Sequence, residues 1–265
     1  MQLATHVEQW LSDGRVQLNV QMIAPAIAGE GLPHYEVLIS VSDETGVPGS
    51  PVRFIEAAER YSKMPLVDQF VVRSVFEWMA AHPDALEGIS GLSINLSGQS
   101  IMQEDFLGFV LEQFERTGAP PGKVCIELTE TAAVGDLFRA REFMLKCKVM
   151  GYRLSLDDFG AGMSSYSYLR RLPVDYLKID GSFVRDMVNE ESDLAVVRPI
   201  NEIGHFLGKK TVAEHVHNEK TAELARSMGI DYLQRWGVEK PKPIDALVFS
   251  TEQPAVAAVE VSASS

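Results

Sequence analysis

Residues 152–162 have the sequence YRLSLDDFGAG, in which a short apolar strand pattern ends in charged residues. The apolar part alternates only weakly, as expected for a strand of a parallel sheet that is covered on both faces. The strand ends at Asp157 and Asp158, and a glycine-containing loop follows. Adjacent carboxylates repel each other and need a cation or hydrogen-bond donors to offset the repulsion. The stretch therefore predicts a buried strand that ends at a charged site.

Similar apolar runs lie on either side of this stretch, and helical patterns separate most of them. Strands that alternate with helices favour a parallel α/β barrel or a doubly wound sheet. The fingerprints GxGxxG and GxxxxGKS are absent, and 265 residues suit one barrel, which typically has about 250. We therefore expect a barrel of the TIM type. Its other strands are predicted at 15–23, 34–42, 91–97, 123–130, 174–180, 209–216 and 230–236.

The composition narrows the class of protein further. Hydrophobic residues make up 46% of the chain, which is enough for a core, and the net charge is −13. That charge argues against a binder of nucleic acid polymers, which relies on Lys and Arg, but it allows a small phosphate ligand held through a metal. No apolar stretch reaches the roughly 18 residues of a membrane span, so we expect a cytoplasmic protein. Cys125 and Cys147 are expected to be buried free thiols.

Polar side chains follow the predicted strands at the points where the strands end. Because the carboxyl ends of parallel strands share one face, these residues can converge there although they are far apart in sequence. A cage of carboxylates suits Mg²⁺ or Mn²⁺ and, through the metal, a phosphate. The residues concerned are Glu36, Asn95, Glu127, Glu130, Asp157, Asp158, Lys178, Glu214 and Gln234.

Each of these residues also has a simpler explanation. A single acidic or amide residue after a strand is often only a helix N-cap. Lys178 is either a buried salt-bridge partner for the carboxylates or a group that positions and activates water. His215 and His217 would share one face of a strand and could form a zinc pair, which we consider the weaker alternative. The predicted cage rests on the whole set of residues.

Seven short motifs follow one another along the chain: EVL at 36–38, NLS at 95–97, ELTET at 127–131, DDFGAG at 157–162, LKID at 177–180, AEHV at 213–216 and DYLQ at 231–234. In this order they resemble the EAL domain family over about Arg15 to Pro243. The resemblance implies a modified (β/α)8 barrel with one antiparallel strand, which binds cyclic di-GMP. Active members cleave one phosphodiester with Mg²⁺ or Mn²⁺ and release pGpG.

The resemblance also implies a role for individual residues. The metal ligands would be Glu36, Asn95, Glu127, Asp157 and Asp158. The catalytic set would be Lys178, Glu214, Glu130 and Gln234, with Glu130 ordering the loop beside the metals. The ligand contacts would be Gln21, Glu36, Leu38, Ser40, Asp68, Asn95, Asp158, His215, Val216, His217, Gln234, Arg235 and Pro241.

Several positions depart from the family pattern. Ser40 stands where the family has a phosphate-contacting arginine, and a charged hydrogen bond of this kind contributes about 1.5–3 kcal/mol. His215 and His217 replace a glycine and a carboxylate, and Arg235 offers a compensating cation. Asp68 is expected to face a guanine edge.

Two functions are compatible with this pattern. The departures favour a catalytically poor receptor of the FimX type, which would bind cyclic di-GMP without metal and signal to a PilZ-type partner in type IV pilus, motility or biofilm control. The complete ligand set favours an active phosphodiesterase that needs Mg²⁺ or Mn²⁺. We expect the receptor as the main function, with the enzyme as the alternative. Residues 1–248 are expected to form one barrel domain, the C-terminal domain of a longer signalling protein, and 249–265 a disordered tail.

Overall fold

The computed structural model of the chain describes residues 2–42, 46–162, 166–234 and 240–252. Its strands are β1 (Val16–Pro25), β2 (His34–Ser42), β3 (Pro48–Gly49), β4 (Gly91–Asn95), β5 (Val124–Thr129), β6 (Arg153–Phe159), β7 (Tyr176–Ile179), β8 (Lys210–Ala213), β9 (Tyr232–Gln234) and β10 (Lys242–Pro243).

Helices follow most of the strands. They are α1 (Gln2–Ser12), α2 (Val52–Arg60), α3 (Met64–Ala81), α4 (Pro83–Glu87), α5 (Gly98–Ile101), α6 (Phe106–Thr117), α7 (Glu130–Gly135), α8 (Leu137–Val149), α9 (Tyr166–Leu169), α10 (Gly181–Asp186), α11 (Glu191–Phe206) and α12 (Glu219–Ser227), with 3₁₀ helices η1 (Pro121–Lys123) and η2 (Ile244–Glu252). None of these helices is both long enough and apolar enough to span a bilayer.

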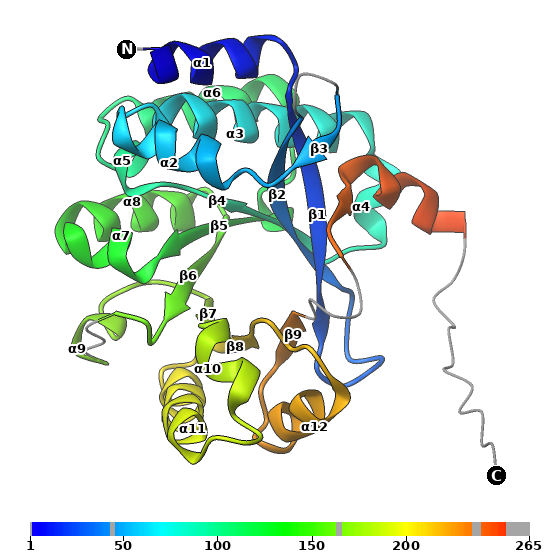
Figure 1. Cartoon of the computed structure of the whole chain (residues 1–265), viewed down its shortest axis with the longest axis vertical. Coiled ribbons are helices and arrows are strands. Elements are labelled where there is room, and N and C mark those ends of the chain that lie inside the picture. The colour runs from blue at the N-terminus through cyan, green and yellow to red at the C-terminus, as the bar shows by residue number, and fades with distance from the viewer. Residues whose placement is uncertain (1, 43–45, 163–165, 235–239, 253–265) are drawn as a thin grey trace.

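The sheet closes into a barrel through its first strand (Figure 1). Strands β2 and β4 to β9 pair in parallel with their neighbours, and β1 closes the ring by pairing antiparallel with both β2 and β9. This arrangement confirms the predicted barrel with one antiparallel strand and excludes a doubly wound sheet. Closure also leaves no free edge among the strands of the ring.

Alternation along the strands divides their side chains between two environments. Leu154, Leu156, Ile126 and Leu128 point outward, and they are fully buried because helices such as α8 cover the outside of the barrel. The residues between them point into the barrel. The outward-facing residues of β5 and β6 are therefore apolar, while polar residues are concentrated inside the ring.

The barrel interior has two polar layers, one above the other. Residues two apart on one strand face the same side, so each residue of the upper layer has a partner directly beneath it. Five strands contribute such pairs. In the upper layer and directly beneath it they place Glu36 over His34 (β2), Asn95 over Ser93 (β4), Glu127 over Cys125 (β5), Asp157 over Ser155 (β6) and Lys178 over Tyr176 (β7).

The boundaries of several predicted strands differ from the observed ones, and two of these differences concern predicted site residues. Strand β8 ends at Ala213, so Glu214 lies in the turn that follows it. In place of the last predicted strand, 230–236, the structure has the shorter β9 (Tyr232–Gln234), and Arg235 lies outside the described residues. Residues 249–252, which the sequence assigned to a tail, belong to η2. Cys125 and Cys147 are buried and free, which confirms their prediction.

A test of the fold uses two glycines. A methyl group on Gly91 would lie 2.5 Å from the backbone oxygen of Lys123, whereas nothing lies within 4 Å of the equivalent position on Gly108 in α6. We expect Gly91→Ala to lower the free energy of unfolding by about 1–3 kcal/mol through overpacking. The control Gly108→Ala should raise it by about 0.5–1 kcal/mol, because alanine favours a helix. Urea titration measures both, and equal effects would contradict the close approach of β4 to η1 at Gly91.

Candidate active site

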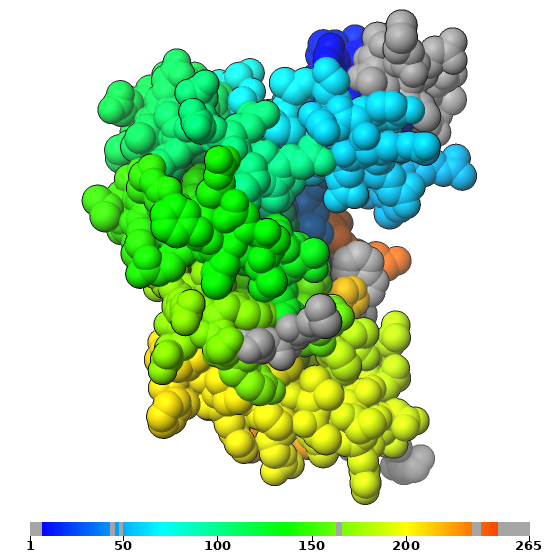
Figure 2. All heavy atoms as spheres, turned by 90° about the vertical axis from the view of Figure 1, so that its left-hand side faces the viewer, coloured from blue at the N-terminus to red at the C-terminus, as the bar shows by residue number. Residues whose placement is uncertain are grey.

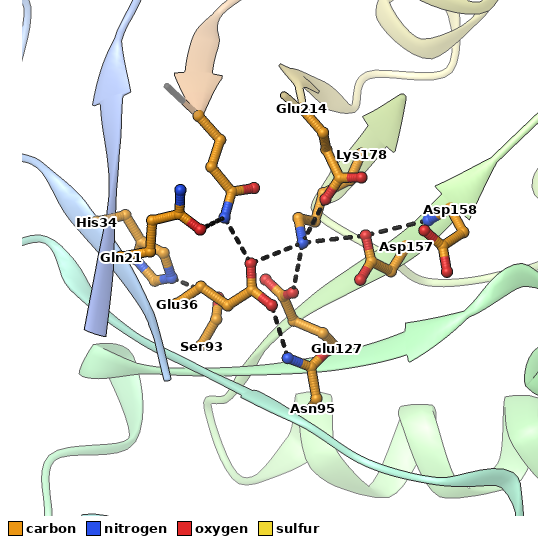
Figure 3. Close-up of polar contacts among 11 residues, drawn as sticks. Gln21, His34, Glu36, Ser93, Asn95, Glu127, Asp157, Asp158, Lys178 and Glu214 are labelled. Carbon is orange, nitrogen blue, oxygen red and sulfur yellow. Dashed lines mark hydrogen bonds and ion pairs between the residues drawn. The ribbon is translucent and has the colours of Figure 1, made fainter. Parts of the chain in front are cut away.

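The carboxyl ends of neighbouring strands converge on one lysine ammonium group (Figure 3). Lys178 Nζ lies 2.8 Å from Glu214 Oε1, 2.9 Å from Glu127 Oε2, 3.0 Å from Asp157 Oδ1 and 3.1 Å from Glu36 Oε2. We call these five residues the acid cage. All five are buried, and the lysine is only 1% exposed. The cage thus combines four carboxylates with one ammonium group in a site from which water is largely excluded.

The position of the cage follows from the fold. Its residues come from β2, β5, β6, β7 and the turn after β8, which all present their carboxyl ends to the same side of the barrel. Helices α5, α7 and α9 begin on this side (Figure 1). Figure 2 looks onto it and shows a hollow between the cyan and green upper part and the yellow lower part, with blue atoms from the first strands on its floor. The site is therefore at the usual functional face of an α/β barrel.

Burial makes the carboxylates difficult to ionise without more positive charge. Burial raises the pKa of Glu127 to about 7, although Lys178 opposes the shift. The pKa of Asp158 rises to about 6, first through burial and then through the neighbouring charge of Asp157. Burial also raises the pKa of Glu214 well above its usual range. One ammonium group does not neutralise this many acids.

Glu36 is the exception, because hydrogen bonds hold it in its ionised form. Burial would raise its pKa, but Lys178 and the amides of Asn95 and Gln234 outweigh burial and lower it. Asn95 Nδ2 donates to Glu36 Oε1 at 2.7 Å, and Gln234 Nε2 donates to Glu36 Oε2 at 2.8 Å. Gln234 Nε2 also donates to Gln21 Oε1 at 3.2 Å. These amides fix the orientation of the Glu36 carboxylate.

Two groups of carboxylates within the site suit divalent cations. Glu36, Glu127 and Asp157 have ligand oxygens within 4.8 Å of one another, and so have Asp157, Asp158 and Glu214. Asp157 belongs to both groups. Carboxylate oxygens are the preferred ligands of Mg²⁺ and Mn²⁺, and a shared carboxylate is typical of paired metal ions. The donor set therefore fits the metal that the sequence predicts.

Asp158 adopts an unusual backbone conformation to reach this position. Its φ is +54°, in the left-handed region that residues other than glycine rarely occupy. Its backbone N–H donates to Asp157 Oδ1 at 3.0 Å, which offsets part of the charge on that carboxylate. Strained residues of this kind are concentrated at functional sites.

A family model described as "EAL domain" matches residues 5–241, which is most of the chain. The chain belongs to the EAL domain family. Among curated relatives, the cyclic di-GMP phosphodiesterase PdeB of Shewanella oneidensis is 34% identical over 241 residues, covering 91% of this chain and 28% of the relative. The cyclic di-GMP phosphodiesterase PdeA of Borreliella burgdorferi is 31% identical over 212 residues, covering 80% of this chain and 32% of the relative. The chain thus spans about a third or less of these relatives.

Solved structures show the same fold. A complex of the PaMucR phosphodiesterase with c-di-GMP superposes with a TM-score of 0.86 at 27% identity, covering 93% of this chain and 100% of that one. The FimX EAL domain of Pseudomonas aeruginosa bound to c-di-GMP has a TM-score of 0.82 at 20% identity, covering 91% and 96%. At that identity the FimX structure shows the common fold alone.

Glu130 anchors the loop beside the cage of this EAL domain. Its side chain is buried, and its Oε2 accepts a hydrogen bond from the Gly160 backbone N–H at 3.1 Å. The Tyr168 hydroxyl donates to its Oε1. Glu130 thereby connects the start of α7 to the loop after β6 and to α9. This geometry suits the loop-ordering role that the resemblance implies.

Other residues of the predicted ligand set lie around this face or outside the described residues. Ser40 accepts a hydrogen bond from Asn19 at 2.8 Å, and Leu38 lies between it and Glu36 on β2. Val216 donates its backbone N–H to the Gln234 carbonyl oxygen at 2.9 Å. Pro241 directly precedes β10. The predicted Arg235 is not among the described residues, so its role stays a prediction.

The two histidines after β8 lie in different surroundings. His215 is exposed, has a φ of +51° and packs against Gly181, where a methyl group would lie 2.1 Å from its Nδ1. His217 is exposed and its Nε2 lies 2.7 Å from Asn218 Nδ2. Within the described ranges, neither belongs to a group of three metal-ligating side chains.

Asp68 lies in a buried serine cluster. Its Oδ2 accepts hydrogen bonds from the Ser97 backbone N–H at 2.8 Å, from the Ser97 hydroxyl at 2.7 Å and from the Ser100 hydroxyl at 2.5 Å. Burial raises its pKa despite these donors. The carboxylate therefore holds the start of α5 in place, and its predicted guanine contact stays a prediction.

Sequence analysis missed His34 and Ser93, which lie directly beneath the cage. His34 Nε2 lies 2.6 Å from Ser93 Oγ (Figure 3). The spacing of two residues from Glu36 and Asn95 places both inside the barrel, and this signal could have found them.

Replacing the central lysine tests the charge balance of the cage. Lys178→Met leaves buried carboxylates uncompensated, so we expect the free energy of unfolding in EDTA to fall by about 3–5 kcal/mol. Adding Mn²⁺ should restore much of this loss, because a bound cation replaces the missing charge. Thermal unfolding with and without Mn²⁺ measures the effect.

Lys209→Met is the matched control. Lys209 is buried, but its ammonium group donates to the backbone oxygens of Leu172 and Val174 at 3.0 and 3.1 Å, away from the cage. Its replacement should destabilise the chain without any gain in the response to Mn²⁺. An equal Mn²⁺ response in both variants would contradict the metal site.

Proposed function

We propose that this EAL domain is a metal-dependent phosphodiesterase that hydrolyses cyclic di-GMP to linear pGpG. The observation that carries the proposal is the pair of carboxylate groups that share Asp157 at the carboxyl ends of the barrel strands. The relatives named as cyclic di-GMP phosphodiesterases support the substrate. A receptor that works without metal would not need so many buried acids.

The chain's own residues have distinct roles in this reaction. Glu36, Asn95, Glu127 and Asp157 would hold one metal ion, and Asp157, Asp158 and Glu214 the second. When bound, such ions lower the pKa of water and stabilise negative charge on a phosphate. Gln234 and Asn95 orient Glu36, and Glu130 orders the neighbouring loop.

Lys178 would stabilise charge and Glu214 would transfer a proton while water attacks the phosphorus atom. The oxygen of a water molecule attacks phosphorus, the P–O3′ bond breaks, and the O3′ atom leaves as a hydroxyl after taking up the proton that the water releases. In its ionised form, the Glu214 carboxylate would accept this proton from the water and pass it to O3′. Lys178, 2.8 Å from Glu214, offers N–H donors to the negative charge that develops.

The ligand would lie over the cage, where a buried hydrogen-bond donor could bind one of its oxygens. Among the described residues, the buried Nε2 of Gln21 has no hydrogen-bond partner. A buried donor without a partner is costly, so a ligand oxygen there would be favourable. Ser40 is uncharged, so it cannot give the ligand phosphate the charged hydrogen bond that an arginine would give. We expect weaker phosphate binding than in relatives with arginine, but an intact reaction centre.

We prefer this function to the receptor that the sequence favoured. The departures at Ser40, His215 and His217 lie outside the acid cage. The likeness to FimX domains concerns the fold alone, and it supplies no argument for a PilZ-type partner or for pilus control. The assignment of residues 1–248 to one domain of a longer cytoplasmic signalling protein stays a prediction.

Product analysis tests the proposal directly. Incubation with cyclic di-GMP and Mn²⁺ should yield pGpG, followed by chromatography, and EDTA should abolish the reaction. Glu36→Gln should lower the rate by about 10²-fold or more, the loss that a misplacement of about 1 Å produces at a reaction centre. The control Glu142→Gln makes the same change on the exposed face of α8 and should leave the rate unchanged.

The receptor predicts the opposite result. Calorimetry in EDTA would then show tight binding of cyclic di-GMP, and no pGpG would form with Mn²⁺. That combination would overturn the proposed phosphodiesterase.

A further inference from the structure

The layer beneath the acid cage contains a set of donor atoms that the proposed reaction does not use together. His34 on β2 and Cys125 on β5 lie on either side of β4, and Glu127 is the cage residue directly above Cys125. A ring nitrogen of His34, the Cys125 sulfur and a carboxylate oxygen of Glu127 all lie within 4.8 Å of one another. We call these three residues the mixed cluster, because it combines a nitrogen, a sulfur and an oxygen donor.

The mixed cluster is buried inside the barrel beside a small space. The exposed fraction is 8% for His34, 1% for Cys125 and 2% for Glu127. His34 and Glu127 line the space, whose volume is about 10 Å³. This volume is close to the minimum that holds one water molecule. The space therefore suits a single ion and excludes a larger ligand.

Ser155 supplies independent evidence for a bound species at this place. Its side chain is 1% exposed and lines the same space, and its hydroxyl has no hydrogen-bond partner among the described residues. The register of β5 and β6 sets Ser155 opposite Glu127, so the hydroxyl lies beside the mixed cluster. A buried hydroxyl without a partner is costly, so an ion or an ion-bound water beside it would be favourable.

The donor types of the mixed cluster select the kind of ion. Thiolate and imidazole ligands favour Zn²⁺, whereas Mg²⁺ and Mn²⁺ prefer oxygen ligands. A thiolate and a carboxylate carry two negative charges, which balance a divalent cation, and a neutral imidazole adds none. The ion would thus be buried without excess charge, which avoids the main cost of placing charge in a protein interior. Zinc takes the thiolate, so its binding releases the thiol proton to solvent.

His34 is already held in an orientation that suits a metal ligand. Its Nε2 lies 2.6 Å from Ser93 Oγ, inside the barrel, and its Nδ1 lies 3.4 Å from Ser90 Oγ (Figure 3). A histidine that binds a metal through one nitrogen usually donates the other N–H to a nearby acceptor, which fixes the ring. The Ser90 hydroxyl can accept from Nδ1. Nε2 would then bind the ion in place of its hydrogen bond to Ser93.

We propose that the mixed cluster is a binding site for one Zn²⁺ ion, with His34, Cys125 and Glu127 as its ligands. A hydroxyl or water beside Ser155 would fill the fourth position of a tetrahedral site. The ligand atoms of such a site lie roughly 3.5 Å from one another, so small rotations of the three side chains would close them on the ion. This binding does not depend on the proposed phosphodiesterase reaction.

Cobalt spectroscopy tests the site without any measurement of activity. Co²⁺ can replace Zn²⁺, and it gives an intense near-ultraviolet charge-transfer band when a thiolate binds it. We expect titration of the metal-free chain with Co²⁺ to produce this band with one ion per chain, and equimolar Zn²⁺ to abolish it. A large excess of Mg²⁺ should leave the band unchanged, because Mg²⁺ prefers oxygen ligands.

The two buried free cysteines provide a matched pair of variants. Cys125→Ser should abolish the band, whereas Cys147→Ser, which changes the other thiol in α8, should retain it. Within the described ranges, Cys147 belongs to no group of three metal-ligating side chains. His34→Phe decides the matter if Cys125→Ser does not fold. It keeps the thiol but removes a ligand, so it should raise the Kd for Co²⁺ by at least the about 10–100-fold that loss of a ligand's partner costs.

The mixed cluster shares Glu127 with the cation group of the cage. One equivalent of bound Zn²⁺ should therefore raise the apparent Kd for Mn²⁺ by about 5-fold or more, a typical coupling between two sites, and Cys125→Ser should remove this effect. This coupling rests on the proposed function. An unchanged Kd for Mn²⁺ in the zinc-loaded chain would overturn the assignment of Glu127 as a zinc ligand.

Asp157→Asn separates the zinc site from the proposed reaction centre. It alters the carboxylate that joins the two cation groups of the cage and leaves the mixed cluster in place, so the Co²⁺ band should persist. No thiolate band in the unaltered chain, or equal bands in Cys125→Ser and Cys147→Ser, would overturn the zinc site alone. A normal band in a chain that forms no pGpG with Mn²⁺ would support the zinc site and overturn the proposed function.

Discussion

The structure depends on the burial of one ammonium group among four carboxylates. An isolated lysine at 1% exposure would lose its charge, because desolvation disfavours the ionised form. In this chain the carboxylates outweigh desolvation and raise the pKa of Lys178 well above its usual range. Each carboxylate comes from a different strand or from the turn after one, so the barrel must close in one register to bring them together. The reversed strand β1 makes that closure.

The same balance of charge explains why the site suits divalent cations. The carboxylates exceed what Lys178 can neutralise, and burial raises the pKa of Glu127 to about 7 and that of Asp158 to about 6. An excess of buried negative charge does not stabilise a folded chain. Divalent cations would neutralise this charge and would bind tightly as a result. The cage is therefore costly to the fold and favourable to the binding of divalent cations.

Much of this arrangement was predictable from the sequence, for a simple reason. Parallel strands present their carboxyl ends to one face, so polar residues such as Glu127 and Asp157 could be placed together from local patterns. The pattern did not show that Lys178 contacts all four carboxylates, because such contacts depend on the register of closure. His34 and Ser93 were not predicted because they lie one layer below the strand ends, where no motif marks them. The serines that hold Asp68 were missed because hydrogen bonds between distant segments leave no local signal.

We propose that the two carboxylate groups joined by Asp157 hold a pair of cations. Electron paramagnetic resonance of the chain loaded with Mn²⁺ tests this claim most directly, since ions that share a carboxylate are magnetically coupled. The account predicts binding of two Mn²⁺ ions per chain with a coupled spectrum, and an uncoupled spectrum from a single ion after Asp157→Asn. An uncoupled signal from the unaltered chain, or no bound Mn²⁺, would contradict it.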